Sequence, residues 1–288
     1  MKQKIFLEGS EVRLNGDEQC YRFLNTQAIS GSLAKSSADA LELVFENGKL
    51  IKKFNWQYEF QDLLELEEDE KGFPYFSAPI HDYFALKAAK EGYSFLGGEL
   101  PEGFQLPKLG ACPSFQFLGT LSPKTEGLEW LPFDLNLAAP IYGSFLQLFL
   151  DYSDPMHPQI WDPEAYTNSD YEDDNVKSDT ELVYEKQFLK SKKLKKMPDF
   201  FEENPGYLGV PHWIQNPQIL NCPKTGELMR FVAQFGRGVD IKLKRANIEV
   251  PDEGYYAELL GRMNFWADGD LYVFLNPNSK MVCIIIQH

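Results

Sequence analysis

The chain has 288 residues, a hydrophobic fraction of 43% and a formal net charge of −15. This is enough apolar material for one large domain or two closely packed halves. Because binding to a polyanion requires a basic surface, the charge argues against a nucleic-acid binder and suits a basic protein partner. No run of eighteen apolar residues is present, and Glu8 and Glu11 interrupt the N-terminal stretch where a signal peptide would be apolar. We therefore expect a cytoplasmic protein that does not enter a membrane.

Residues 1–92 are expected to form strands and one helix that belong to the first half of the protein. Aromatic residues make up 14% of the chain, and such side chains favour a β-rich interior. Asn47 and Gly48 separate two apolar runs. Both residues tolerate the positive φ that tight hairpin turns require, so this pair predicts a β-hairpin.

Two further segments are expected to be helical. Residues 77–92 place Tyr83 and Leu86 at helical spacing and end in Gly92, a residue suited to a helix C-terminus. Residues 186–196 contain six lysines and no acidic residue. They predict a short amphipathic helix whose lysines remain in solvent, with binding to an anionic surface as the alternative.

An internal repeat is the main organising feature of the sequence. Each copy has an aromatic-Leu-Gly turn, then a Pro, a Cys-Pro loop, an apolar strand and a closing strand. Two copies indicate a duplicated domain and not a solenoid. The aromatic residues of the apolar strands are expected to lie in the core. The matched segments are 95–98 with 207–210, Pro101 with Pro211, 112–113 with 222–223, 115–118 with 229–232, and 146–151 with 271–276.

The connector between the copies, residues 156–200, differs in composition. Residues 155–185 contain nine acidic residues and only Lys177 as a base, which predicts a solvated acidic loop. Part of this loop has the ligand spacing of a calcium-binding loop, with Asn175 where a Gly is expected. Ion binding by this segment is therefore left open. The calcium-like positions are Asp170, Glu172, Asp174, Val176, Ser178 and Glu181.

The four cysteines, at positions 20, 112, 222 and 283, are widely spaced, and we expect reduced thiols. A zinc site needs paired thiolates or imidazoles at short spacing, whereas Cys222 has Thr225 where a second Cys would be required. Cys283 lies in an apolar run and is expected to be buried and inert. We predict neither a metal nor a cofactor.

The polar and aromatic residues around the second copy are the best candidates for a ligand or partner site. A half-buried amide must find hydrogen-bond partners or cost about 1–3 kcal/mol. These side chains either attach loops to the sheet or bind a ligand. The candidates are His212, Trp213, Gln215, Gln234, Trp266 and Asp268.

No established catalytic motif occurs in the chain. It has no Gly-x-Ser-x-Gly elbow, His-Glu-x-x-His helix or phosphate-binding Gly-Lys-Ser/Thr loop. Asp151, Asp154 and His157 are the group that could carry acid–base chemistry at a strand end, with turn formation around Pro155 as the alternative. We therefore predict no catalytic residue and favour a non-enzymatic role.

The order of these motifs resembles the YwqG-like family of uncharacterised bacterial proteins. The similar segments are residues 207–215, the Cys222 loop, residues 227–234 and residues 263–275, and the likeness extends over about 93–286. The resemblance implies a sheet-rich α+β fold with two related halves and no established activity. A more distant similarity is to the programmed cell death protein 2 family, which is associated with chaperoning a ribosomal protein. Val210 and Thr225 depart from its Gly and Cys.

Together these features predict an α+β protein dominated by antiparallel sheet, with few short helices and two pseudo-symmetric halves packed as one unit. The leading function is a protein-binding module, immunity-like or chaperone-like, with an aromatic cleft between the halves. The alternative is a hydrolase or small-molecule-binding enzyme that uses this cleft and residues such as Asp151, Asp154, His157 or His212. The oligomeric state is left open. The expected segments are 1–92, 93–155 (first copy), 156–200 (connector) and 201–288 (second copy).

Overall fold

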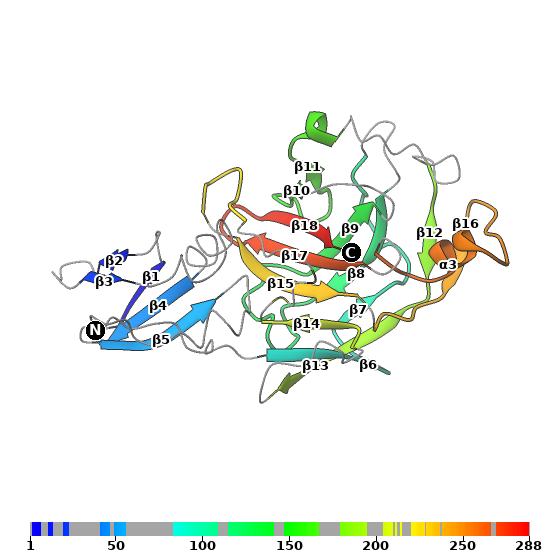
Figure 1. Ribbon diagram of the computed structural model, residues 1–288. Coiled ribbons are helices and arrows are strands. Elements are labelled where there is room, and N and C mark those ends of the chain that lie inside the picture. Colours follow the sequence, from blue (N-terminus) through cyan, green and yellow to red (C-terminus); the bar gives the residue numbers. More distant parts are fainter. Residues whose placement is uncertain are drawn as a thin grey trace.

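The computed structural model describes much of the chain from residue 83 onward and isolated strands before it (Figure 1). In the first 55 residues only the backbone of the strands is described. The described residues are 2–6, 11–13, 20–22, 41–46, 49–55, 83–108, 115–140, 147–166, 179–194, 204–209, 211, 214, 220–227, 229–236, 238–265 and 269–287.

A large sheet of eleven strands dominates the described part of the chain, and its neighbouring strands pair antiparallel. This confirms the β-rich prediction. In sheet order the strands are β11 (Gln159–Ile160), β10 (Leu148–Asp151), β18 (Met281–Gln287), β17 (Asp270–Asn276), β15 (Arg230–Phe235), β14 (Gly206–Leu208), β6 (Tyr83–Ala89), β13 (Gln187–Leu194), β7 (Ser94–Leu96), β8 (Phe115–Leu121) and β9 (Leu135–Pro140).

The remaining described elements are short. Pairing of Glu46 with Lys49 places the predicted hairpin turn between β4 and β5. Within the described residues, no helix is of a length and apolarity that would cross a membrane. The smaller sheets are β1 (Lys2–Phe6) with β4 (Leu41–Glu46) and β5 (Lys49–Asn55), β2 (Glu11–Arg13) with β3 (Cys20–Arg22), and β12 (Leu182–Tyr184) with β16 (Leu243–Ala246). The described helical elements are the 3-10 turn η1 (Pro163–Tyr166) and the helix α3 (Tyr255–Gly261).

The core lies along the long strands of the large sheet. All seven residues of β8 and of β17 are buried, as are six of the seven in β18. The predicted core aromatics Phe117 and Phe231 are 6% and 3% exposed. Burial of one such side chain contributes about 1.5–3 kcal/mol, so these strands account for much of the stability.

The two predicted helices are wrong, because β6 and β13 occupy these segments. Each strand is paired along both edges, β6 by β13 and β14, and β13 by β6 and β7. Leu86 and Leu189 are buried, and the lysines that follow them, Lys87 and Lys190, are exposed. Pairing with distant strands satisfies the backbone and outweighs the helix propensity of Ala and Lys in these segments.

Two sets of three strands pair in matching registers. In the first set, β7–β8–β9, Phe95 pairs with Thr120, and in the second set, β14–β15–β17, Tyr207 pairs with Gln234. The ladder in each set shifts at a bulge that directly follows Phe117 or Phe231. We call these the first and second strand sets.

The predicted match between segments 146–151 and 271–276 is wrong. The strand that closes the first set is β9, whereas β10 pairs with β18 at the far side of the second set. β9 and β10 are both short apolar runs in the sequence, so only their pairing partners show that β9 is the closing strand.

The first strand of each half is exchanged between the strand sets. β6 precedes β7 in the chain but pairs with β14, and β13 precedes β14 but pairs with β7. β6 and β13 also pair with each other, with Lys87 opposite Lys190. We call the place where β6 and β13 join the two sets the junction.

Candidate functional site

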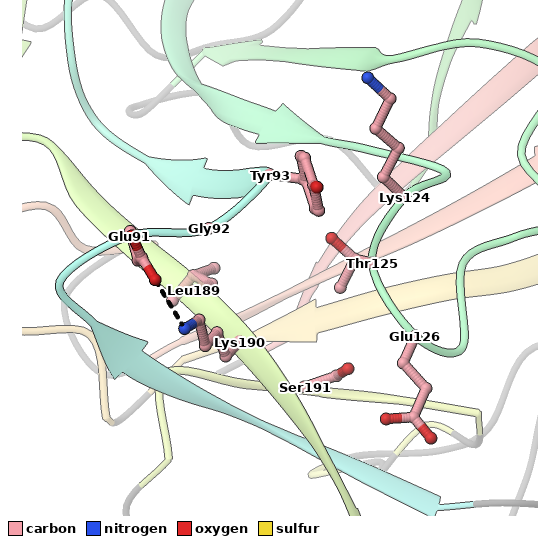
Figure 2. A pocket seen from close by; sticks show the side chains of 9 residues that line it. All are labelled: Glu91, Gly92, Tyr93, Lys124, Thr125, Glu126, Leu189, Lys190 and Ser191. Carbon is pink, nitrogen blue, oxygen red and sulfur yellow. Dashed lines mark hydrogen bonds and ion pairs between the residues drawn. The ribbon is translucent and has the colours of Figure 1, made fainter.

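A pocket of about 500 Å³ lies at this junction, which we call the junction pocket (Figure 2). Three segments that are far apart in the sequence form it. They are the turn before β7, the loop after β8 and the middle of β13. Its lining residues are Glu91, Gly92, Tyr93, Lys124, Thr125, Glu126, Leu189, Lys190 and Ser191.

Close backbone contact fixes one side of the pocket. A Cβ atom on Gly92 would lie 2.5 Å from the backbone oxygen of Leu189, so only glycine allows the turn to pass this close to β13. The backbone of β13 therefore occupies the place where a side chain on Gly92 would lie. The sequence prediction placed Gly92 at the end of a helix, whereas its observed role is this close approach of two strands.

Buried hydroxyl groups fix the other side. The Ser94 and Thr125 hydroxyls lie 2.6 Å apart, and the backbone N–H of Ser122 donates to Ser94 Oγ at 3.0 Å. All three residues are buried, so these hydrogen bonds hold the loop after β8 against the start of β7. In Figure 2 this loop, with Thr125 and Glu126, lies across the pocket from Ser191.

The charged groups of the pocket are exposed. Lys190 Nζ lies 3.5 Å from Glu91 Oε1, and both side chains are more than half exposed. Lys124 Nζ lies 5.4 Å from the centre of the Tyr93 ring, and Tyr93 is 62% exposed. Contacts of this kind contribute about 0–1 kcal/mol each, so a ligand can replace them at small cost.

The chemistry available in the pocket is that of binding. Its lining offers ammonium groups, carboxylates, hydroxyls and one exposed aromatic ring, and it includes neither an imidazole nor a thiol. Lysines and hydroxyls donate hydrogen bonds to an anionic or carbonyl group, and the Tyr ring offers apolar contact.

Of the predicted site residues, the structure describes Gln234. It is buried on β15, and its Nε2 donates to Asp270 Oδ2 at 2.5 Å and to the Tyr272 hydroxyl at 3.2 Å. The backbone N–H of Ile214 donates to the same hydroxyl at 3.1 Å. This network attaches the chain at Ile214 to the sheet. His212, Trp213, Gln215, Trp266 and Asp268 lie outside the described residues.

The acid–base candidates, which begin at the last residue of β10, take part in a turn. Asp151 Oδ1 accepts from the backbone N–H of Ser153 at 2.8 Å, and Asp154 Oδ1 accepts from the backbone N–H of Met156 at 2.9 Å. His157 Nδ1 lies 2.8 Å from Asp154 Oδ2 at the surface, and this contact lowers the pKa of Asp154. None of them lines the junction pocket.

The Cys222 loop closes through its backbone. Cys222 N–H donates to the Glu227 carbonyl, and Gly226 N–H donates to the Cys222 carbonyl, both at 2.7 Å. Burial raises the pKa of the Cys222 thiol, but hydrogen bonds, first with Ser279 at 3.2 Å, outweigh burial and leave the pKa below its ordinary value. Cys283 is buried as predicted, and burial raises its thiol pKa.

No group of three or more His, Cys, Asp or Glu that could hold a metal ion occurs among the described residues. Most of the calcium-like segment, from Asp170 to Ser178, lies outside them. Its last position, Glu181, is described, and its Oε1 accepts from Arg245 at 2.9 Å.

The junction pocket could not be predicted from the sequence. Its lining residues are ordinary surface and loop types, and what makes them a site is the pairing of β13 with β7, about ninety positions apart in the chain. The one available signal was the lysine-rich segment 186–196, which was interpreted as a helix.

Comparisons with known proteins give no match. No family model, no curated protein and no solved structure matches the chain.

Proposed function

We propose that the chain is a protein-binding module, immunity-like or chaperone-like, which holds its partner at the junction pocket. The observation that supports this proposal is an open, polar pocket, formed where β13 meets the first strand set, with an exposed aromatic ring in its lining. The cytoplasmic location expected from the sequence belongs to the same proposal.

The lining favours a protein partner for physical reasons. Tyr is enriched at protein interfaces because it offers a large contact area at a low cost in side-chain entropy, together with a hydroxyl group. Tyr93 is 62% exposed and lies next to the lysine and carboxylate groups of the pocket. A partner side chain or backbone can therefore make apolar and polar contacts at the same place. The hydrolase alternative has less support, because Asp151, Asp154 and His157 lie in a separate turn.

The test compares two equally exposed tyrosines. We expect Tyr93→Ser to reduce the amount of partner captured at native expression levels at least tenfold. Tyr255 on α3 is 59% exposed and does not line the pocket, so Tyr255→Ser is the matched control and should leave capture unchanged. Equal capture by wild type and Tyr93→Ser would overturn the pocket as the partner site.

We also propose that the chain is an α+β protein whose two strand sets arose by internal duplication. The matching registers, the bulge at the same position of β8 and β15 and the exchange of β6 and β13 support this origin. A solved structure of a relative with a single set that assembles as a dimer would test it.

A further inference from the structure

One edge of β13 continues past the strand that pairs with it. β7 pairs with β13 only at residues 187–189, whereas β6 pairs along the opposite edge as far as Leu194. Within the described residues, no strand takes the place of β7 beside Lys190 and Ser191. The junction pocket lies at this place, and both residues line it.

The backbone of Ser191 is directed toward the pocket. The Leu189 carbonyl lies on the β7 side, since a Cβ on Gly92 would lie 2.5 Å from it. Backbone groups that point to one edge of a strand recur every second residue, so the N–H and C=O of Ser191 point to the same edge. An extended chain in the pocket would therefore continue the ladder that β7 begins.

From this geometry we infer that the pocket receives an extended segment of a partner protein, which adds to the β13 edge at Ser191 as a short strand. This segment is acidic, in contrast to the basic partner that the net charge of −15 alone suggests. This inference rests on the proposed protein-binding function. Strand addition is a common form of peptide recognition in which main-chain hydrogen bonds give affinity and the neighbouring side chains give selectivity.

The acidic character follows from the charges near this edge. β13 contains Lys190, Lys192 and Lys193 and no acidic residue, and Lys124 lies across the pocket. Lys87 on β6 pairs directly opposite Lys190, but its ammonium donates to Asn204, so the positive charge in the pocket comes from Lys190 and Lys124.

Two carboxylates, Glu91 and Glu126, line the same pocket. Glu91 is the carboxylate that contacts Lys190, at 3.5 Å between exposed groups, and a partner carboxylate can replace it there. Lysines also discourage non-specific strand pairing at an open edge, so a segment that neutralises them gains selectivity.

The experiment uses a synthetic eight-residue peptide in which Glu alternates with Thr, with fluorescence anisotropy as the readout on the full chain. The matched probe alternates Lys with Thr. We expect the Glu peptide to bind at least tenfold more tightly than the Lys peptide. The double variant Lys124→Glu/Lys190→Glu should reverse this preference.

Hydrogen bonding to the Ser191 backbone is tested with a separate variant and a separate measurement. Ser191→Pro removes the N–H directed at the pocket and leaves the β6 side of the ladder in place, so it should weaken Glu-peptide binding at least tenfold. Amide hydrogen exchange at Ser191 in the unaltered protein should slow on binding. This second measurement decides the question even if the Pro variant does not fold.

The outcomes separate the two proposals. If neither peptide binds or Ser191 exchange does not change, while partner capture still depends on Tyr93, strand addition is wrong and the protein-binding function stands. If capture is also independent of Tyr93, both proposals fail. Tighter binding of a single-stranded octanucleotide than of the Glu peptide would overturn the choice of a protein ligand.

Discussion

The two sides of the junction differ in how their space is filled. Phe95 in the first strand set and Tyr207 in the second occupy matching positions, so Gly92 and Asn204, three residues before them, also correspond. At Gly92 the pocket is open. At Asn204 the side chain is buried, donating to the Tyr207 hydroxyl at 2.7 Å and accepting from Lys87.

This difference shows that matched backbones can serve different purposes. The second set uses its junction for stability, because a buried amide with two polar partners joins β6 to β14. The first set has a glycine at this position, in close contact with the Leu189 backbone, and a pocket lined by Gly92, Tyr93 and two lysines. Substitutions at matched positions should therefore have unequal effects.

The largest difference is expected at the bulges. Gly119 has φ of +142°, and a Cβ there would lie 2.2 Å from the Phe95 backbone oxygen, so Gly119→Ala should reduce the free energy of unfolding by about 3 kcal/mol. The matching residue of the second set is Ala233, and Ala233→Gly should cost only about 1 kcal/mol. Chemical denaturation measures both values. A similar loss in the two variants would contradict the structural difference between the bulges.

A smaller difference is expected in the buried polar pairs. Gln234→Leu leaves Asp270 and Tyr272 without their amide donor and should cost about 2 kcal/mol. At the matching position Thr120→Val removes one hydroxyl, whose bond to Asn136 Oδ1 is 2.8 Å, and should cost about 1 kcal/mol. Thermal unfolding of each variant against wild type checks the order. An equal or reversed order would show that the Gln234 network is not the more stabilising one.

The smallest difference is expected at the central lysines. Lys87→Met removes the donor to the buried Asn204 amide and should cost about 1 kcal/mol. Lys190→Met removes only an exposed contact with Glu91 and should change stability by less than about 0.5 kcal/mol. If urea denaturation gives the larger loss for Lys190→Met, the assignment of stability to the Asn204 side would be wrong.

Local features could be predicted from the sequence, whereas the pairing of strands far apart in the chain could not. The hairpin turn at Asn47 and Gly48, the burial of Phe117 and Phe231 and the β-rich class follow from residue types and alternation. The segments of β6 and β13 are predicted as helices from the helical spacing of Tyr83 and Leu86 before Gly92 and from the lysine-rich amphipathic pattern of 186–196. The neighbours that make them strands are far away in the chain.

The candidate site was harder to predict for the same reason. Gln234 was selected because a buried amide needs partners, and the structure provides them in Asp270 and Tyr272, away from the residues that line the junction pocket. The pocket depends on Gly92 meeting Leu189, a contact between segments that no local pattern connects.

The exchange of β6 and β13 also governs the order in which the protein can be completed during synthesis. β7 has its second neighbour only after residues 187–189 have been made, and β6 has both neighbours only after β13 and β14 are present. Neither half can therefore finish its part of the sheet alone, and the loop closures span about a hundred residues, which slows folding. Two fragments separated within the connector should each remain incomplete and recover the native sheet only when mixed.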